Sequence, residues 1–448
     1  MRLIFATLIL FCPIVLFAQV PLTPSPSVLP KVTLPQRGSN SLIAPALIPA
    51  PFPISNTRVS MAEQHKAIRD EVEEYLQKKD AHDRQIQQLI SEAYSTNETS
   101  VVYTIPHVRK PGKAAYYQAL DELINMIYDT LPVDLIRATY LVESAFDPTI
   151  PSDYIRLYVK NAANHILRKT DQDGLDLSDN LVKNMMIFRY MTDTLAVDYE
   201  GIEKPILSYP KTYDFEDFWG TQDWSKMFVS KLMRDGSGQC HSLPLLYLMI
   251  AQEIGASANL AFAPNHSYIK FQDKRGNWQS LELTIGGLSS DNFILQSGFV
   301  KSEAIRSKIY MEAINDRQLI AQSINDLVSG YVKRYGYDDR NFFQTAFQAV
   351  YKVFPNSITA HQINANYYAA QVQYVVAQCQ QHGLEQEQFD RDEKAQFLLG
   401  QMNGAFKHIE NLGFAPMPED AYSSWLASVE ELSNKQFSKV KMEGFIKQ

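Results

Sequence analysis

The apolar positions along this chain follow a helical period in most places and a strand period in one. Apolar residues spaced three and four positions apart among charged ones occur in 58–107, in 115–127 and in 135–146, the last ending before Pro148. One apolar face at this spacing is typical of an amphipathic helix. We therefore predict one or two helices in the first segment and one helix in each of the other two.

A strand period appears between 258 and 284. Residues 258–263 are largely apolar, and 266–271 and 278–284 alternate between apolar and polar side chains. The polar segment 273–277, which contains a glycine, has the composition of a hairpin loop. These segments predict a small antiparallel sheet in the middle of the chain.

Helical spacing returns after residue 302 and continues toward the C-terminus. It is carried by three apolar stripes: Ile305, Ile309, Tyr310 and Ile314; then Phe343, Ala346, Phe347, Val350 and Phe354; then Ala365, Tyr368, Ala369, Val372 and Val376. Helix pairs of this length suggest tetratricopeptide-like repeats, although the period is irregular and a generic helical bundle fits equally well. The predicted fold class is therefore α+β, a core with a small antiparallel sheet followed by an all-α, repeat-like domain.

The first 57 residues carry signals of export. Residues 1–19 start with a basic residue, Arg2, continue with a mostly apolar run that contains Pro13, and end on Ala18 before a polar residue. This pattern is typical of a secretory signal, and the run is shorter than the ~20 residues that span a bilayer. The prolines crowded into 20–57 favour an extended, disordered tether. We expect an exported protein, periplasmic or extracellular, with no membrane span after signal removal.

The composition narrows the classes of function. With 448 residues the chain is long enough for two or three folded units, and 45% apolar residues exclude wholesale disorder. A net charge of -8 leaves no broad basic face, so nucleic acid is not an expected partner. Only three cysteines occur, which excludes a disulfide-stapled small fold and a zinc site of four cysteines. Glycine motifs for phosphates or dinucleotides are missing at strand-to-helix junctions, so no cofactor is expected.

The segment around Cys240 carries the strongest chemical signal. Two glycines and polar residues precede Cys240, and a long amphipathic helix is predicted from there to Gly255. Unpaired N–H groups and the positive end of the helix dipole favour a thiolate at such a position. His266, at the start of a predicted strand, is the candidate base, and Glu282 lies in the next strand. A hairpin centred near Lys274 would set 266 opposite 282, where a carboxylate can orient the imidazole.

This order of motifs resembles the transglutaminase-like superfamily. The shared features are Gly-x-Cys opening a helix, an Ile-Gly-Ala step into a strand, a His at a strand start, and Trp-x-x-Leu-acid-x-Thr. The resemblance implies a papain-like fold with a Cys–His–Asp arrangement, in which Cys240 is the nucleophile, His266 the base, and Glu282 stands in the place of the Asp. The run 243–248 resembles bacterial members that carry tetratricopeptide repeats after the core, which implies a protein partner at the helical C-terminal domain.

Three features depart from the usual pattern of that superfamily. Glu282 is one methylene longer than Asp, Tyr268 stands where many members have Trp, and the interval of 26 residues from Cys240 to His266 is short. Some members have also lost activity. For Cys240 taken alone, an inert buried cysteine is the alternative. A zinc site built from Cys240, His241 and His266 has poor spacing and lacks a fourth ligand.

A second resemblance lies at Glu143. The stretch 141–148 resembles the Glu-Ser-x-Phe-x-Pro sequence around the catalytic acid of lytic transglycosylases, where one glutamate serves as general acid. The downstream Gly-rich and Met-Gln motifs of that family are missing, and the stretch also fits a packing helix. Cys379 lies on a helical stripe and is most simply a core residue. A disulfide between Cys240 and Cys379 would consume the proposed nucleophile.

The predicted organisation has five parts: a signal peptide at 1–19, a Pro-rich tether at 20–57, an amphipathic helical segment at 58–107, a transglutaminase-like domain at 108–296, and a helical, tetratricopeptide-like domain at 297–448. The function we expect is acyl transfer or hydrolysis of an amide bond in a protein or peptide substrate, through a thioester on Cys240, with backbone N–H groups holding the oxyanion. The alternative is a non-catalytic scaffold or binding protein that uses its helical repeats. The sequence leaves open which of the two applies.

Overall fold

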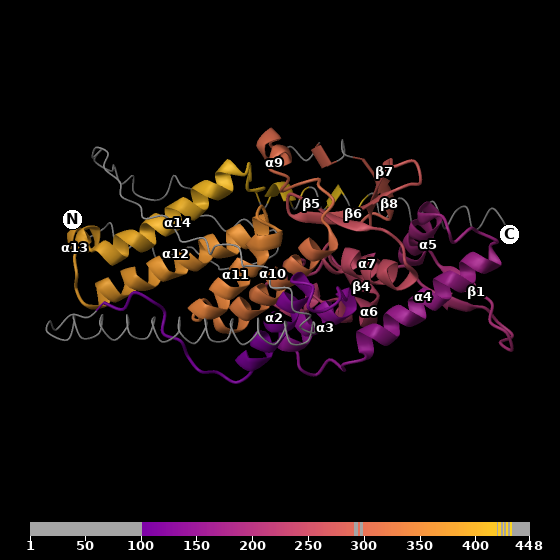
Figure 1. Ribbon diagram of the computed structural model, residues 1–448, viewed down its shortest axis with the longest axis horizontal. Helices are drawn as coiled ribbons and strands as arrows, with labels where there is room; N and C mark the ends of the chain where they lie inside the picture. The colour runs from indigo at the N-terminus through magenta and orange to yellow at the C-terminus, as the bar shows by residue number, and fades with distance from the viewer. Residues whose placement is uncertain are drawn as a thin grey trace, which may run out of the picture. The chain divides into compact units, whose positions relative to one another are not determined.

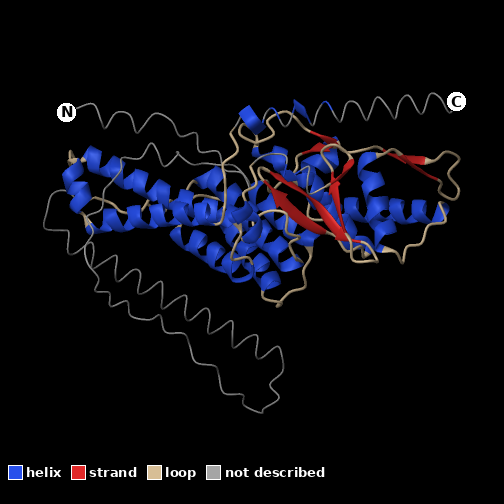
Figure 2. Ribbon diagram, turned by 90° about the horizontal axis from the view of Figure 1, so that it is seen from above, coloured by secondary structure: helices blue, strands red, loops and turns tan. Residues whose placement is uncertain are grey.

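The structure, a computed structural model, describes residues 101–290, 294–295 and 299–418, together with 420–422, 424, 427–428 and 431. The predicted signal peptide and tether lie outside these residues. So does the predicted helical segment 58–107, except for 101–107, which are not helical. Residues from Val102 onward belong to one compact unit, which is α+β and mostly helical with small sheets (Figures 1 and 2).

The first part of this unit is helical. It contains α2 (Lys113–Ile127), α3 (Leu135–Phe146), α4 (Tyr154–Gln172) and α5 (Asn180–Thr192). The helices predicted at 115–127 and 135–146 are therefore confirmed. Asp134 begins α3 by accepting a hydrogen bond from Arg137 N at 2.9 Å, which satisfies one of the unpaired donors of the first turn.

Two short strand pairs follow, and the sequence did not predict them because two or three residues carry no readable period. β1 (Leu195–Val197) pairs antiparallel with β2 (Ile206–Ser208), and β3 (Thr212–Tyr213) pairs parallel with β4 (Ser237–Gly238). The crossover from β3 to β4 contains the 3-10 helix η3 (Trp224–Met227) and α6 (Val229–Asp235). The parallel pair matters for the site because β4 leads directly to Cys240.

The predicted antiparallel sheet is present. It consists of β5 (Asn259–Ala263), β6 (His266–Gln272), β7 (Trp278–Glu282) and β8 (Gly287–Ser289), joined in that order. The predicted hairpin loop 273–277 connects β6 to β7 and is closed by a hydrogen bond from Asp273 N to Asn277 O at 3.0 Å.

Helix α7 (Ser242–Ile254) lies between the sheet and the other helices (Figure 1). It packs against α3, α4, α5 and α6, and against β5 and β6. Nearly every side chain of α7 is buried, as expected for a helix that is apolar on all sides. Gly255 ends the helix with a positive φ of 66°, a left-handed conformation that glycine adopts without steric cost.

The C-terminal part is again helical. It contains α9 (Ser302–Arg306), α10 (Asp316–Tyr335), α11 (Arg340–Val353), α12 (Ile358–Gln381), α13 (Gln386–Arg391) and α14 (Glu393–Asn411). The second and third predicted stripes are confirmed as α11 and α12. Helices α12 and α14 lie side by side, and α10 packs against α2 and α3 (Figure 1). One hydrophobic core therefore extends across residue 297, while the tetratricopeptide-like repeat stays a prediction.

The first predicted stripe, 305–314, is wrong as a helix. Helix α9 stops at Arg306, and the backbone after it runs along the edge strand β5, with Met311 N donating to Phe262 O at 2.8 Å and Ile314 N to Leu260 O at 2.9 Å. Ile309, Tyr310 and Ile314 are buried, whereas Ile305 on α9 is exposed. Within the described part of the chain, no helix has the length and apolar character to cross a bilayer.

Candidate functional site

Cys240 lies at the junction between β4 and α7, close to the predicted position. Gly238 makes this junction tight, because a Cβ atom there would lie 2.5 Å from Ser242 Oγ and 3.1 Å from Leu232 Cβ. Gln239 N donates to Ser242 Oγ at 2.9 Å. The side chain of Cys240 is half-buried, and its Sγ lies 3.9 Å from Asn265 O. The sulfur is thus presented at the edge of the core, next to the turn that precedes His266.

His266 is the first residue of β6 and follows a two-residue turn. Asn265 in that turn has a φ of 55°, a left-handed conformation that asparagine tolerates better than most residues. Ser267 Oγ donates to Cys240 O at 2.6 Å, which fastens the beginning of β6 to the start of α7. The structure therefore brings Cys240 and His266 together across 26 residues, as the sequence predicted.

Glu282 contacts His266 from β7, with Oε2 2.5 Å from Nε2, and both side chains are buried. The predicted register, however, is wrong by two residues. Because Gln272 pairs with Trp278, the hairpin is centred on Arg275, and continuing the register places 266 opposite 284. His266 and Glu282 are thus diagonal neighbours on one face of the sheet. A diagonal lies within reach of long side chains such as glutamate.

Thr284 holds the other oxygen of this carboxylate. Its backbone N–H donates to Glu282 Oε1 at 3.0 Å and its hydroxyl donates to the same oxygen at 2.6 Å. Burial favours the neutral acid, but the charge of His266 and the hydrogen bonds from His266 and Thr284 outweigh it and lower the pKa of Glu282. Glu282 therefore stays ionised. The role of Thr284 was missed, although it belongs to the Trp-x-x-Leu-acid-x-Thr motif.

The electrostatics of His266 favour its charged form. Burial alone lowers its pKa, but the Glu282 carboxylate, a side-chain hydrogen bond with Cys240, and the charge on Cys240 together raise the pKa of His266 to about 10. Glu282 contacts the ring at Nε2, and Cys240 contributes to the raised pKa of the same ring. A carboxylate, an imidazolium and a sulfur are thus brought together, the set of groups in a nucleophile–base–orienter triad.

Two tyrosines complete the surroundings of Cys240, and no local pattern in the sequence indicated either. Tyr213 lies in β3, paired with Gly238 of β4, and Tyr422 comes from the segment after α14. Burial, the nearby Tyr213 hydroxyl and Cys240 raise the pKa of Tyr422. Contacts across 182 residues of chain leave no local pattern, so these residues can be found only from the folded structure.

His241 is directed away from this triad. Its Nε2 lies 3.6 Å from Asp326 Oδ2 on α10, in a small cavity that Glu143 also lines. This agrees with the prediction that His241 is not the base.

Glu143 has a structural position. It is buried and accepts hydrogen bonds from Val229 N at 2.5 Å and Ser230 N at 3.1 Å, the first two N–H groups of α6. Burial raises the pKa of Glu143 to about 7, against the opposing effect of these hydrogen bonds. The stretch that resembles lytic transglycosylases therefore forms a packing helix, α3, whose glutamate caps a neighbouring helix from within the core.

Both cysteines within the described residues are free thiols, and Cys379 is buried in α12, where burial raises its pKa. Nowhere among the described residues do three His, Cys, Asp or Glu side chains gather as a metal-ligand set.

Comparison with known proteins gives no match to this chain, whether among family models, curated proteins or solved structures. The function is therefore argued from the geometry of Cys240, His266 and Glu282.

Proposed function

We propose that this protein is a cysteine enzyme that breaks or exchanges amide bonds, with a papain-like, transglutaminase-like core in which Cys240 is the nucleophile, His266 the base and Glu282 the orienting acid. The observation that carries the proposal is the position of His266, whose Nε2 is fixed by Glu282 at 2.5 Å while the next residue, Ser267, donates from its hydroxyl to Cys240 O at 2.6 Å. An imidazolium near a half-buried free thiol is the pairing that a nucleophilic cysteine requires.

The first half of the reaction follows from this pairing. The Cys240 thiolate forms a bond to the carbonyl carbon of the amide, and the carbonyl electrons move to oxygen. His266 then gives its proton to the amide nitrogen, the C–N bond breaks, and the amine leaves. The products of this half are a thioester on Cys240 and a neutral His266. Glu282 keeps the ring oriented and stabilises the imidazolium before and after the step.

The second half regenerates the thiolate. His266 takes a proton from water or from an amine, the oxygen or nitrogen attacks the thioester carbonyl, and the C–S bond breaks. Water yields a carboxylic acid and makes the enzyme a peptidase or amidase, whereas an amine yields a new amide and makes it a transamidase. Both outcomes use the same three residues.

An oxyanion forms in both halves and requires donors near the sulfur. The N–H of Gln239 is committed to Ser242 Oγ at 2.9 Å. We assign the oxyanion to the backbone N–H of Cys240, which is adjacent to the reacting sulfur at the positive end of α7.

The test compares the two thiols within one molecule. Iodoacetamide should alkylate Cys240 at least about tenfold faster than Cys379 in the native protein, because only Cys240 has an imidazolium partner. His266→Ala should abolish most of this difference while thermal unfolding stays cooperative. Mass spectrometry of the two cysteine peptides gives both rates. Slow, equal alkylation of both thiols would contradict the enzyme and favour the alternative, a scaffold that engages a protein partner through its helical domain.

A further inference from the structure

A pair of aromatic side chains lies in the loop between β3 and η3. Phe218 and Trp219, in the loop 214–223 that follows β3, pack with ring centroids 5.1 Å apart. Asp217 shapes the end of the loop by accepting backbone hydrogen bonds from Thr221 N at 2.7 Å, Gln222 N at 3.0 Å and Asp223 N at 2.8 Å. Three bonds to one carboxylate fix the backbone from which both rings project.

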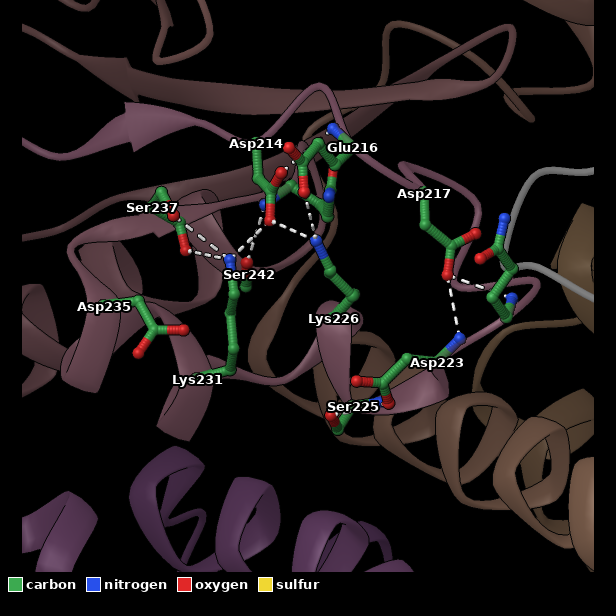
Figure 3. A network of polar contacts seen from close by, with 12 residues as sticks. Asp214, Glu216, Asp217, Asp223, Ser225, Lys226, Lys231, Asp235, Ser237 and Ser242 are labelled. Atoms are coloured by element: carbon green, nitrogen blue, oxygen red, sulfur yellow. Dashed lines mark hydrogen bonds and ion pairs between the residues drawn. The ribbon is translucent and has the colours of Figure 1, made fainter.

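The other end of the loop is tied to the strand that leads to Cys240. Figure 3 shows Lys226 and Lys231 reaching Asp214, at 3.3 Å and 2.6 Å from its Oδ2. Lys231 also donates to Ser237 O at 2.9 Å, and Asp214 N donates to Gly238 O at 2.8 Å. These hydrogen bonds and ion pairs, all made within residues 214–238, hold the loop that carries the aromatic pair against β4, which leads to Cys240. Groups that are preorganised in this way are suited to binding.

Tyr422 occupies the space in front of this pair. Its ring stacks on Trp219 with centroids 4.6 Å apart and an interplanar angle of 30°, and lies 5.6 Å from Phe218. Only 1% of Tyr422 is exposed. The ring therefore covers the aromatic pair, whose loop is tied to β4 by Asp214 N donating to Gly238 O, and Cys240 is among the groups that act on the Tyr422 hydroxyl.

The segment that carries Tyr422 is guided to this place. After α14, Gly413 passes so close to α9 that a Cβ atom would lie 2.2 Å from Ala304 N, and its φ is 89°. Phe414 and Met417 are buried, and Tyr422 N donates to Pro418 O at 3.0 Å. The path after α14 is thus held by close packing at Gly413, Phe414, Met417 and Tyr422.

We propose that Phe218 and Trp219 form the subsite for an aromatic side chain of the peptide substrate, and that Tyr422 of the chain's own C-terminal segment fills this subsite as an intramolecular pseudosubstrate. This inference rests on the proposed function. A substrate carbonyl must come to the Cys240 sulfur, where the Tyr422 hydroxyl now lies, so Tyr422 must leave before acylation. The hydrogen bonds within the loop 214–223 are kept when Tyr422 leaves. The exposed rings of Phe218 and Trp219 then accept an aromatic side chain of the substrate.

Stacking energy permits a substrate ring to replace Tyr422. An aromatic pair contributes about 0.5–1.5 kcal/mol beyond the burial of its surface, so a competing aromatic ring regains the stacking energy that Tyr422 loses. An alanyl side chain regains little of this stacking energy. The subsite therefore predicts a preference for aromatic over small side chains next to the scissile amide.

The experiment uses the full-length chain and three thiol reagents: iodoacetamide, N-chloroacetyl-phenylalanine amide and N-chloroacetyl-alanine amide, in which the thiolate displaces the halide. We expect Tyr422→Ala to raise the rate of Cys240 with the phenylalanyl reagent by about tenfold or more, and with the alanyl reagent by much less. Tyr422→Phe should remain close to wild type with both reagents because the stacking is kept. Phe397→Ala, which removes an exposed ring on α14, is the matched control and should change nothing.

A second substitution tests whether the aromatic pair itself binds the side chain of the reagent. Trp219→Ala in the Tyr422→Ala background should abolish the preference for the phenylalanyl reagent, and Phe218→Leu in the same background should reduce it. Thermal unfolding shows whether each double variant folds. If one of the two does not fold, the other decides whether the aromatic pair is the subsite.

The outcomes separate this proposal from the function on which it rests. Equal gains for both chloroacetyl reagents, or no gain in Tyr422→Ala, would overturn the subsite while rapid iodoacetamide alkylation of Cys240 leaves the enzyme standing. If iodoacetamide alkylates Cys240 no faster than Cys379 in wild type and in Tyr422→Ala alike, the proposed function fails, and the subsite with it.

Discussion

Glu282 holds His266 across a diagonal of the β6–β7 hairpin, with 2.5 Å between Oε2 and Nε2 and the second oxygen fixed by Thr284. The contact is buried and uses the full length of the glutamate side chain. The Glu282 carboxylate therefore both orients the imidazole and supplies the charge that keeps it protonated. Both effects depend on the length of the Glu282 side chain. This makes the position sensitive to changes that are usually conservative.

The length of this side chain can be tested directly. Glu282→Asp withdraws the carboxylate by one methylene and should slow alkylation of Cys240 at neutral pH by about tenfold, because an opposite charge within contact distance shifts a pKa by one unit or more. Glu282→Gln keeps the length, removes the charge, and should slow the reaction at least as much. Alkylation rates of Cys240, with Cys379 as internal reference, measure both. Wild-type rates in Glu282→Asp would show that the diagonal reach is unimportant.

The raised pKa of His266 predicts a pH dependence of stability. The value is about 10 in the folded protein and about 6.5 in an unfolded chain, so between these pH values the folded state binds a proton that the unfolded state lacks. The stabilisation is complete below the lower value, decreases as the pH rises, and is lost above the higher one. Urea midpoints measured across this range should fall with pH in wild type.

The control for this titration is His266→Gln, which cannot bind the proton. Its urea midpoint should be lower at the start of the range and should fall less steeply across it, since only other groups still titrate. Parallel slopes for the two proteins would mean that His266 is not held protonated in the fold.

Gly238 predicts a steric effect with a specific partner. A Cβ atom at this position would lie 2.5 Å from Ser242 Oγ, so Gly238→Ala should destabilise the protein by about 1–3 kcal/mol. In a Ser242→Ala background the clash is smaller, and the loss should be smaller too, which a double-mutant cycle measures. Gly400→Ala is the matched control. It lies within α14 with no atom near its added Cβ and should stabilise by up to about 1 kcal/mol. Equal effects at both glycines would contradict the close approach.

The sequence predicted those features that a local pattern encodes. Helix α7, the strands β5 to β7 and the loop between β6 and β7 all have a readable period or composition, and Cys240, His266 and Glu282 were found because each sits at a fixed place in those elements. The register of the hairpin was off by two residues because it depends on how the loop closes, which composition does not determine.

The features that the sequence missed depend on contacts between distant segments. Residues 309–314 have an apolar spacing that fits a helix, but the free edge of β5 offers hydrogen bonds that a strand-like path can take. Tyr422 and Trp219 approach Cys240 only because α14 and the loop 214–223 are brought to the same place by the fold. Nothing within a window of ten or twenty residues carries such information.

The last prediction concerns Gln239, which immediately precedes the nucleophile. Its side chain is fully buried, and neither atom of its amide group has a hydrogen-bond partner among the described residues. An unpaired buried polar group costs about 1–3 kcal/mol, so Gln239→Met, which has a similar volume, should raise the free energy of unfolding by about 1 kcal/mol. The backbone bond from Gln239 N to Ser242 Oγ is retained in this variant. Gln362→Met is the matched control, because Gln362 on α12 is buried with the same two atoms unpaired and lies on another element. Urea unfolding should show a gain at both positions. A loss of stability in Gln239→Met alone would mean that its amide group makes a bond that the fold requires.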